Sequence, residues 1–180
     1  LRIGTGGLAR LAIALSLMQA SKATNIEGFD LRRFWMTSIQ RGLVFQYLSQ
    51  RVGKMPSAEA FSLGLLADVG QLAMAVSLGA QAVYIGAEGS VQALLAQQLQ
   101  QYGYDQGDAS AVLLAHWGFP QTLAQAVRIR PQTPGAAGSR EAQLGECVAL
   151  SRSLQLRPGG VAADAGQMRS LAEHLHLSES

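Results

Sequence analysis

Apolar residues recur along the chain at the three- and four-residue spacing that predicts amphipathic helices. Leu31–Val52 carries one such stripe, and Val91–Tyr102 carries another opposite a face rich in glutamine. Leu8–Met18 is apolar on nearly all sides, which predicts a helix at the centre of the fold. No segment has the pattern of a convincing strand. The chain is therefore predicted to have an all-α fold, a compact multi-helix bundle.

Capping residues set the predicted bounds of the helices in the middle of the chain. Ser57 is a good N-cap for a helix that reaches Leu66, and Asp68 is a candidate cap for a helix that runs towards Tyr84. These residues have short polar side chains that can accept hydrogen bonds from the exposed N–H groups of a first helical turn. Two helices are therefore predicted in close succession.

The next helices are marked by similar signals. Asp105 is a predicted N-cap, with Asp108 in the first turn, for a helix that stops at Gly118. Pro120 then opens a helix that continues to about Arg130, because proline suits a first helical position.

The C-terminal third contains the clearest breaks. Pro131–Gly138 is a predicted loop, after which Ser139 caps a last long helix over Arg140–Leu156. Arg157–Gly160 is a second break, and a short helix over Met168–Leu175 closes the chain. Neither break looks like a linker between domains. All 180 residues are therefore predicted to form a single domain.

Composition supports a compact fold. Hydrophobic residues make up 48% of the chain and charged residues 14%, which excludes a disordered protein. The single cysteine, Cys147, allows no internal disulfide and fits a reducing compartment, so a cytoplasmic location is predicted. Val69–Ala87 has no charge and is long enough to span a bilayer. Its glutamines, glycines and alanines favour a buried core helix over a membrane span.

The charge pattern is weakly basic. The net charge is +2, and no run of lysine or arginine predicts a nucleic-acid surface. Four arginines do recur along one predicted helix, at Arg32, Arg33, Arg41 and Arg51. This pattern favours the solvated face of an amphipathic helix over a phosphate-binding stripe.

Motifs for catalysis are scarce. The three histidines, His116, His174 and His176, are not spaced as metal ligands on one helix face. The sequence has no P-loop and no nucleophile elbow, and its glycine-rich start matches only part of a dinucleotide fingerprint. These residues alone predict neither a metal centre nor a covalent catalyst.

One segment resembles a known family. Residues 60–72 read AFSLGLLADVGQL, which is similar to the G-L-L-H-D-I-G-K-L stretch of HD-domain metal phosphohydrolases and their HDOD relatives. Further landmarks follow in family order: F-W-M-T-S at 34–38, G-Y-D-Q at 103–106 and A-H-W-G-F-P at 115–120. The resemblance covers about residues 1–156 and implies an HD-like helical fold. The N-terminal part of the family pattern is missing, which implies exposed apolar surface and either self-association or a tight partner contact.

The same resemblance identifies a vestigial pocket. The residues at the metal-ligand positions of the active enzymes are Thr37, Ala67, Asp68, Gln106, Arg130 and Glu146. Asp68 alone keeps the enzyme's residue, Ala67 has no donor atom, and Arg130 would repel a cation. Asp68 is expected to cap the following helix or to pair with Arg130. No catalytic residue, metal or other cofactor is predicted.

The resemblance implies a bacterial regulatory module rather than an enzyme. We expect it to act in signal transduction by binding a protein partner or a ligand, with fused regulatory domains beyond this chain and with no membrane or nucleic-acid partner. Two alternatives remain. One is a phosphohydrolase with an atypical metal set built on Asp68 and Glu146. The other is a nucleic-acid-associated regulator that uses the Arg32–Arg51 helix. The sequence does not identify the signal or the pathway.

Overall fold

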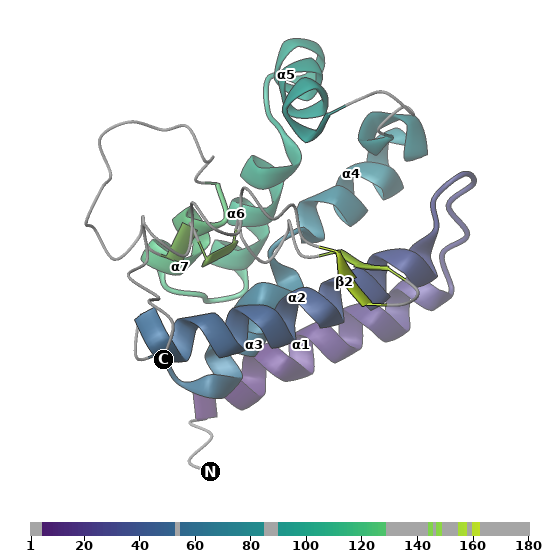
Figure 1. Cartoon of the computed structure of the whole chain (residues 1–180). Coiled ribbons are helices and arrows are strands. Elements are labelled where there is room, and N and C mark those ends of the chain that lie inside the picture. Colours follow the sequence, from purple (N-terminus) through teal and green to yellow (C-terminus); the bar gives the residue numbers. More distant parts are fainter. Residues whose placement is uncertain are drawn as a thin grey trace.

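The computed structural model describes residues 5–52, 55–84 and 90–128, together with 144, 145, 147, 148, 155–157 and 160–162. These residues form helices and one short hairpin (Figure 1). In chain order the elements are α1 (Thr5–Lys22), α2 (Leu31–Val52), α3 (Ser57–Leu66), α4 (Val69–Leu78), the 3₁₀-helix η1 (Ala80–Val83), α5 (Val91–Tyr102), α6 (Gln106–His116), α7 (Gln121–Ala126), β1 (Gln155–Arg157) and β2 (Gly160–Ala162). The predicted all-α bundle is confirmed.

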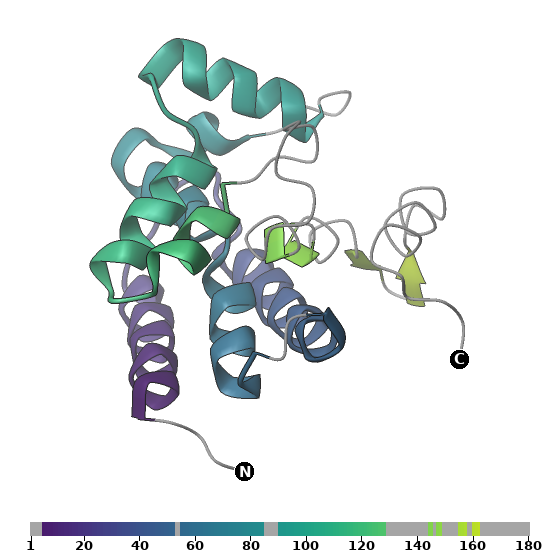
Figure 2. The same ribbon diagram turned by 90° about the vertical axis from the view of Figure 1, so that its left-hand side faces the viewer.

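The helices pack in two groups (Figures 1 and 2). In the first group α3 lies between α1 and α2 and contacts both. In the second group α6 contacts α4 on one side and α7 on the other. The short turn from α3 to α4 joins the two groups. That turn is therefore the point where residues from both groups can meet.

Two glycines allow α2 and α3 to approach closely. A Cβ atom added to Gly64 would lie 2.7 Å from the Cβ of Phe45 and 2.9 Å from the Cα of Gly42. Real side chains do not tolerate such distances, so only glycine fits at this crossing. Phe45, Leu63 and several other fully buried apolar residues fill the core beside it. This close crossing fixes how α2 lies relative to the α3–α4 turn.

The predicted caps around α6 are confirmed. The Asp105 side chain accepts hydrogen bonds from the backbone N–H groups of Gly107 and Asp108, at 2.8 and 2.9 Å. The backbone N–H of Asp105 donates in turn to Oδ2 of Asp108 at 3.1 Å, which completes a capping box. Gly103 and Gly118 have φ angles of 78° and 77°, a left-handed conformation that ends the preceding helices at low cost.

The predicted cap at Ser57 is wrong, and the cap at Asp68 is confirmed in position but not in its hydrogen bond. Pro56, not Ser57, occupies the N-cap position of α3, and the Ser57 hydroxyl instead accepts a hydrogen bond from the Gln46 side chain. Asp68 holds the N-cap position of α4, but its side chain makes no capping bond. In both places the side chain contacts a residue of α2 instead of capping its own helix: Ser57 contacts Gln46, and Asp68 contacts Arg41.

Several predicted bounds also differ. The helix expected from Asp68 towards Tyr84 is broken at Gly79, whose φ of 91° ends α4 and leads into η1. α7 ends at Ala126, short of the predicted Arg130. β1 includes Leu156, the expected end of the last long helix, and pairs antiparallel with β2 across the predicted Arg157–Gly160 break. The predicted Ser139 cap, the 131–138 loop and the 168–175 helix lie outside the described residues.

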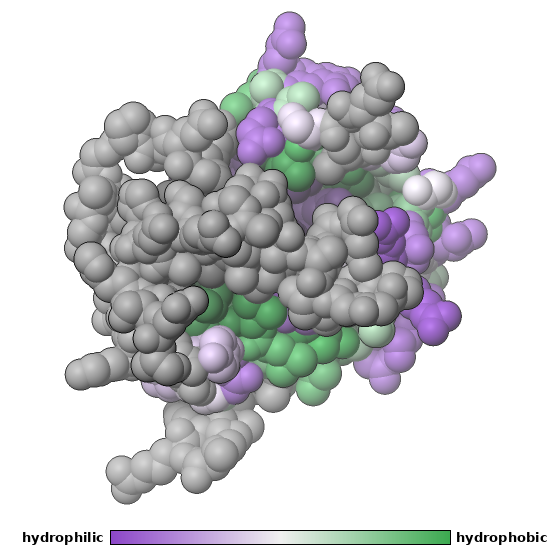
Figure 3. Space-filling model, in the orientation of Figure 1, coloured by the Kyte–Doolittle hydropathy of each residue, from purple (hydrophilic) through white to green (hydrophobic). Residues whose placement is uncertain are grey.

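α1 lies at the edge of the molecule, not at its centre (Figure 2). Ala14 is fully buried, but Leu15 is 51% exposed. The face of the molecule on which α2 lies also shows apolar surface (Figure 3), and the exposed side chains of α2 include Met36 and Leu43. α1, which is apolar on nearly all sides, therefore packs against the fold with one side and leaves apolar residues of the other side exposed to solvent.

In the part of the chain that the structure describes, one stretch is long and apolar enough to cross a membrane. It runs over Ser57–Leu78, and 67% of an apolar 18-residue window within it is buried inside the fold. A core helix passes the same test of length and composition. The burial of α3 and the first half of α4 accounts for this apolar character.

Candidate functional site

A buried ion pair marks the vestigial pocket. Asp68 lies in the turn between α3 and α4, and its Oδ2 atom is 2.8 Å from Nη2 of Arg41 on α2. Both residues are buried, with 8% and 5% of their surface exposed. At this distance the guanidinium donates a charge-assisted hydrogen bond to the carboxylate. The retained acid of the family motif is therefore engaged by a cation from this chain's own sequence.

Arg41 corrects the prediction for the arginines of α2. Arg32 and Arg33 are exposed, as expected for a solvated face. Arg41 instead points into the fold, so the four arginines do not share one solvated face. Gly42, the residue after Arg41, lies at the close crossing of α2 and α3. This crossing brings the Arg41 side chain within reach of Asp68.

The positions beside the ion pair have little metal-binding capacity. Ala67, at the end of α3, is completely buried and carries no donor atom. Thr37 lies one helical turn before Arg41 on α2, on the same face of the helix. It offers a neutral hydroxyl, a poor ligand for a transition metal.

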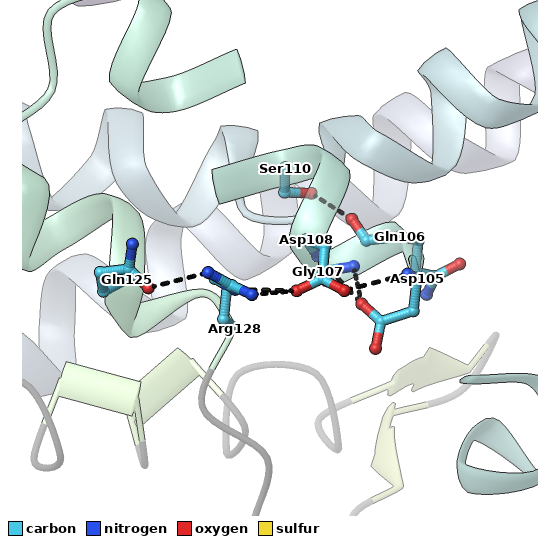
Figure 4. Close-up of polar contacts among 7 residues, drawn as sticks. All are labelled: Asp105, Gln106, Gly107, Asp108, Ser110, Gln125 and Arg128. Atoms are coloured by element: carbon cyan, nitrogen blue, oxygen red, sulfur yellow. Dashed lines mark hydrogen bonds and ion pairs between the residues drawn. The ribbon is translucent and has the colours of Figure 1, made fainter. Parts of the chain in front are cut away.

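Gln106 is held at the first position of α6. Its backbone N–H donates to Oε1 of Gln98 at 3.0 Å. Its carbonyl accepts a hydrogen bond from the Ser110 hydroxyl at 2.9 Å (Figure 4). Ser110 also accepts a hydrogen bond from the N–H of Gly70, two residues after Asp68. These bonds join the start of α6 to the start of α4. Gln106 is thus positioned near the α3–α4 turn.

Gly70 permits this close contact between α4 and α6. A Cβ atom at this position would lie 2.1 Å from the Gln106 carbonyl oxygen and 2.5 Å from the Ser110 nitrogen. No side chain fits in that space. The second glycine of the family-like motif therefore has a packing role, as Gly64 does at the α2–α3 crossing.

Two of the six pocket positions, Arg130 and Glu146, lie outside the described residues. The expected pairing of Arg130 with Asp68 or Glu146 stays a prediction. A nearby arginine that is described, Arg128, contacts Asp108 at 2.7 Å and Gln125 at 3.3 Å (Figure 4).

The described residues do not fit the metal centre of an HD enzyme. That centre needs several imidazoles and carboxylates around the cation. Across 5–52, 55–84 and 90–128, no group of three or more His, Cys, Asp or Glu side chains could hold a metal ion. His116 is exposed at the end of α6, and His174 and His176 lie outside the described residues. The one carboxylate of the pocket that is described already has a guanidinium as its partner.

Sequence reasoning missed Arg41 as a pocket residue, although a signal was present. The buried residues of α2 recur at helical spacing, and Arg41 follows Ser38 by three positions and precedes Phe45 by four. A charged residue in the register of a buried stripe predicts an internal partner. Gln98 was missed for the opposite reason, since it belongs to a series of glutamines of which most are exposed.

Comparison with known proteins gives matches among solved structures. No curated protein matches the chain. The response regulator MmoQ from Methylococcus capsulatus is 26% identical, covers 86% of this chain and 61% of its own, and gives a TM-score of 0.65. A protein from Shewanella amazonensis, provisionally described as a phosphohydrolase, is 22% identical, covers 97% of this chain and 64% of its own, and gives a TM-score of 0.68. The second likeness shows the fold alone.

The chain thus spans about three fifths of the length of these solved structures. The HDOD domain profile matches residues 1–132. That range includes the A-D-x-G motif at 67–70, the Arg41–Asp68 pair, and the contact of Gly70 with α6. This chain belongs to the HDOD family.

Proposed function

We propose that this domain is a non-catalytic signal-transduction module that acts by binding a protein partner or a ligand. The observation that carries the proposal is the buried contact between Arg41 and Asp68. It supplies positive charge to the one metal-ligating residue that the sequence retains. A divalent cation at Asp68 would have to displace the guanidinium or face its repulsion.

The described residues at the other pocket positions also support a non-catalytic role. Hydrolysis of a phosphate ester by an HD-type metal centre needs a metal ion that lowers the pKa of a bound water molecule. Ala67 offers no ligand, and Thr37 and Gln106 offer only neutral groups. Function belongs to the site and not to the fold, so an HD-like bundle alone does not imply hydrolysis.

A role in signalling is favoured by family membership and by one structural relative. MmoQ is a response regulator, and it shares 26% of its aligned residues with this chain. The present chain covers 61% of that structure. That this domain works together with further regulatory domains is therefore part of our proposal. We also propose a cytoplasmic location, in line with the single cysteine, Cys147, which is buried and cannot form an internal disulfide.

A metal-binding experiment tests the proposal directly. Untagged protein should contain no stoichiometric transition metal after incubation with Mn²⁺, Fe²⁺ or Zn²⁺, and it should not hydrolyse bis(4-nitrophenyl) phosphate. Asp68→Asn and the control variant Asp108→Asn, at the half-buried capping carboxylate of α6, should both behave like the parent in these two assays. About one metal ion per chain, lost in Asp68→Asn and kept in Asp108→Asn, would instead establish the atypical phosphohydrolase built on Asp68 and Glu146.

The nucleic-acid alternative loses support at Arg41. A phosphate-binding stripe needs exposed cations on one face, whereas Arg41 is buried against Asp68. Exposed Arg32 and Arg33 remain for such a role. A binding titration with duplex DNA at increasing salt would reveal it as a steep loss of affinity.

A further inference from the structure

α5 stands apart from the rest of the fold. It lies at one end of the molecule, beyond α4 and α6 (Figures 1 and 2). Of its twelve residues, Leu94 and Gln98 are the buried ones. Four glutamines of α5 are exposed: Gln92, Gln97, Gln100 and Gln101. The helix is therefore held through a small area, in contrast to the closely packed α2 and α3.

Among the described residues, the side-chain amide of Gln98 joins α5 to its neighbours through hydrogen bonds. Gln98 is 1% exposed, and its Nε2 atom donates to the Ala82 carbonyl of η1 at 2.8 Å. Its Oε1 atom accepts the backbone N–H of Gln106 at 3.0 Å. Its Nε2 atom also donates a longer bond, of 3.5 Å, to Oε1 of the Gln106 side chain. We call these contacts of Gln98 with Ala82 and Gln106 the Gln98 latch. The latch joins α5 to η1 and to the first residue of α6, which is also a position of the vestigial pocket.

The start of α6 does not depend on α5 for its other bonds. The capping box between Asp105 and Asp108 satisfies the N–H groups of Gly107 and Asp108 from within the turn. Gly103, with a φ of 78°, gives α5 its own end before that turn begins. A Cβ atom at Gly103 would meet nothing within 4 Å, so no other part of the described fold packs against that side of Gly103. α5 can therefore leave without unwinding α6.

We infer that α5 opens as a unit when the Gln98 latch breaks, and that this opening is the conformational switch of the domain. The inference rests on the proposed signalling function, because a signal needs an element with two arrangements. Opening releases the Gln106 N–H beside the pocket and exposes Leu94 together with the partly buried Leu95, Leu99 and Tyr102. The Gln98 side chain thus couples the loss of the hydrogen bond at Gln106 to the exposure of the apolar face of α5.

Hydrogen exchange on the whole chain tests this switch without any partner. Gln98→Met keeps an unbranched side chain but can neither donate nor accept, so one buried donor and one buried acceptor lose their partner. We expect the backbone amides of α5 and that of Gln106 to exchange about tenfold faster than in the parent, while α2 and α3 exchange at unchanged rates. The matched variant Gln97→Met, at an exposed position of the same helix, should change nothing.

A second variant keeps the test decisive if Gln98→Met folds poorly. In Gln98→Glu, a protonated carboxyl can donate to the Ala82 carbonyl and accept from Gln106, whereas the ionised form cannot donate. α5 should therefore be closed at acid pH and open at neutral pH, each relative to the parent at the same pH. Equal acceleration of all helices, or none in either variant, would overturn the switch. Either result would leave the metal-binding test of the proposed function unaffected.

Discussion

At the scale of single residues, the Arg41–Asp68 contact is the main departure from an HD enzyme. A carboxylate that is 8% exposed needs a positive partner or several hydrogen bonds. In an enzyme of this kind a metal ion would meet that need. Here a guanidinium from α2 does so at 2.8 Å. The same acidic residue thus serves the stability of the fold.

This arrangement predicts an asymmetric response to mutation. Arg41→Met should lower the free energy of unfolding by about 3–5 kcal/mol, because it leaves the Asp68 carboxylate buried without its guanidinium. The double variant Arg41→Met/Asp68→Leu should recover much of that loss, since no buried charge remains. Urea denaturation followed by circular dichroism measures both. Arg32→Met, on the exposed part of α2, is the control and should stay within about 0.5 kcal/mol of the parent.

At the scale of elements, the helices differ in how much of their surface is buried against neighbouring helices. α3 is buried along most of its length between α1 and α2. α1 presents Leu15 to the surface, and α2 presents Met36 and Leu43. Exposed apolar side chains on neighbouring helices favour association with another protein surface. The predicted self-association or partner contact at α1 and nearby surfaces remains a prediction.

Charged substitutions on these faces should test it. Leu15→Lys and Leu43→Lys place a charge on the exposed apolar surface, so each should shift a self-associated form towards the monomer in static light scattering. Gln19→Lys adds the same charge at an exposed polar position of α1 and should leave the mass unchanged. A monomeric parent at all concentrations would rule out self-association and leave a heterologous partner.

At the scale of the whole molecule, a few polar contacts hold the two helical groups together. Arg10 of α1 forms an ion pair with Glu59 of α3, and its guanidinium lies 5.0 Å from the ring centre of Phe119. Phe119 is buried in the turn between α6 and α7. Arg10 therefore connects the first helical group to the second through the contact of its planar guanidinium with Phe119, while its ion pair with Glu59 lies within the first group.

Loss of this connection should cost more than loss of an ordinary surface ion pair. Arg10→Ala is expected to lower the free energy of unfolding by about 1–2 kcal/mol, through the lost ion pair and the lost contact with Phe119. Arg128→Ala removes an ion pair in which the arginine is 47% exposed, and it should cost less than about 1 kcal/mol. Thermal unfolding of both variants beside the parent measures the difference. Equal effects would contradict the bridging role of Arg10.

The sequence by itself determined the features that depend on near neighbours. Helical spacing predicts the bundle, and the caps at Asp105 and Gly118 are predictable because their hydrogen bonds or backbone angles involve residues a few positions away. The ordered motifs also identified the HDOD family, which the match over residues 1–132 confirms. The place of Asp68 in a vestigial pocket followed from that resemblance.

Only the tertiary structure decided which side of each helix is covered and which charges meet. Arg41 was assigned to a solvated face, yet it is buried, because the close α2–α3 crossing brings it to Asp68, 27 positions away in the chain. The apolar pattern of Leu8–Met18 predicts a helix at the centre of the fold, whereas α1 lies at the edge of the molecule. Composition indicates how much apolar surface a helix could bury, but it does not indicate whether another helix lies there to cover that surface. Contacts between distant segments depend on how the whole chain packs, which local spacing does not encode.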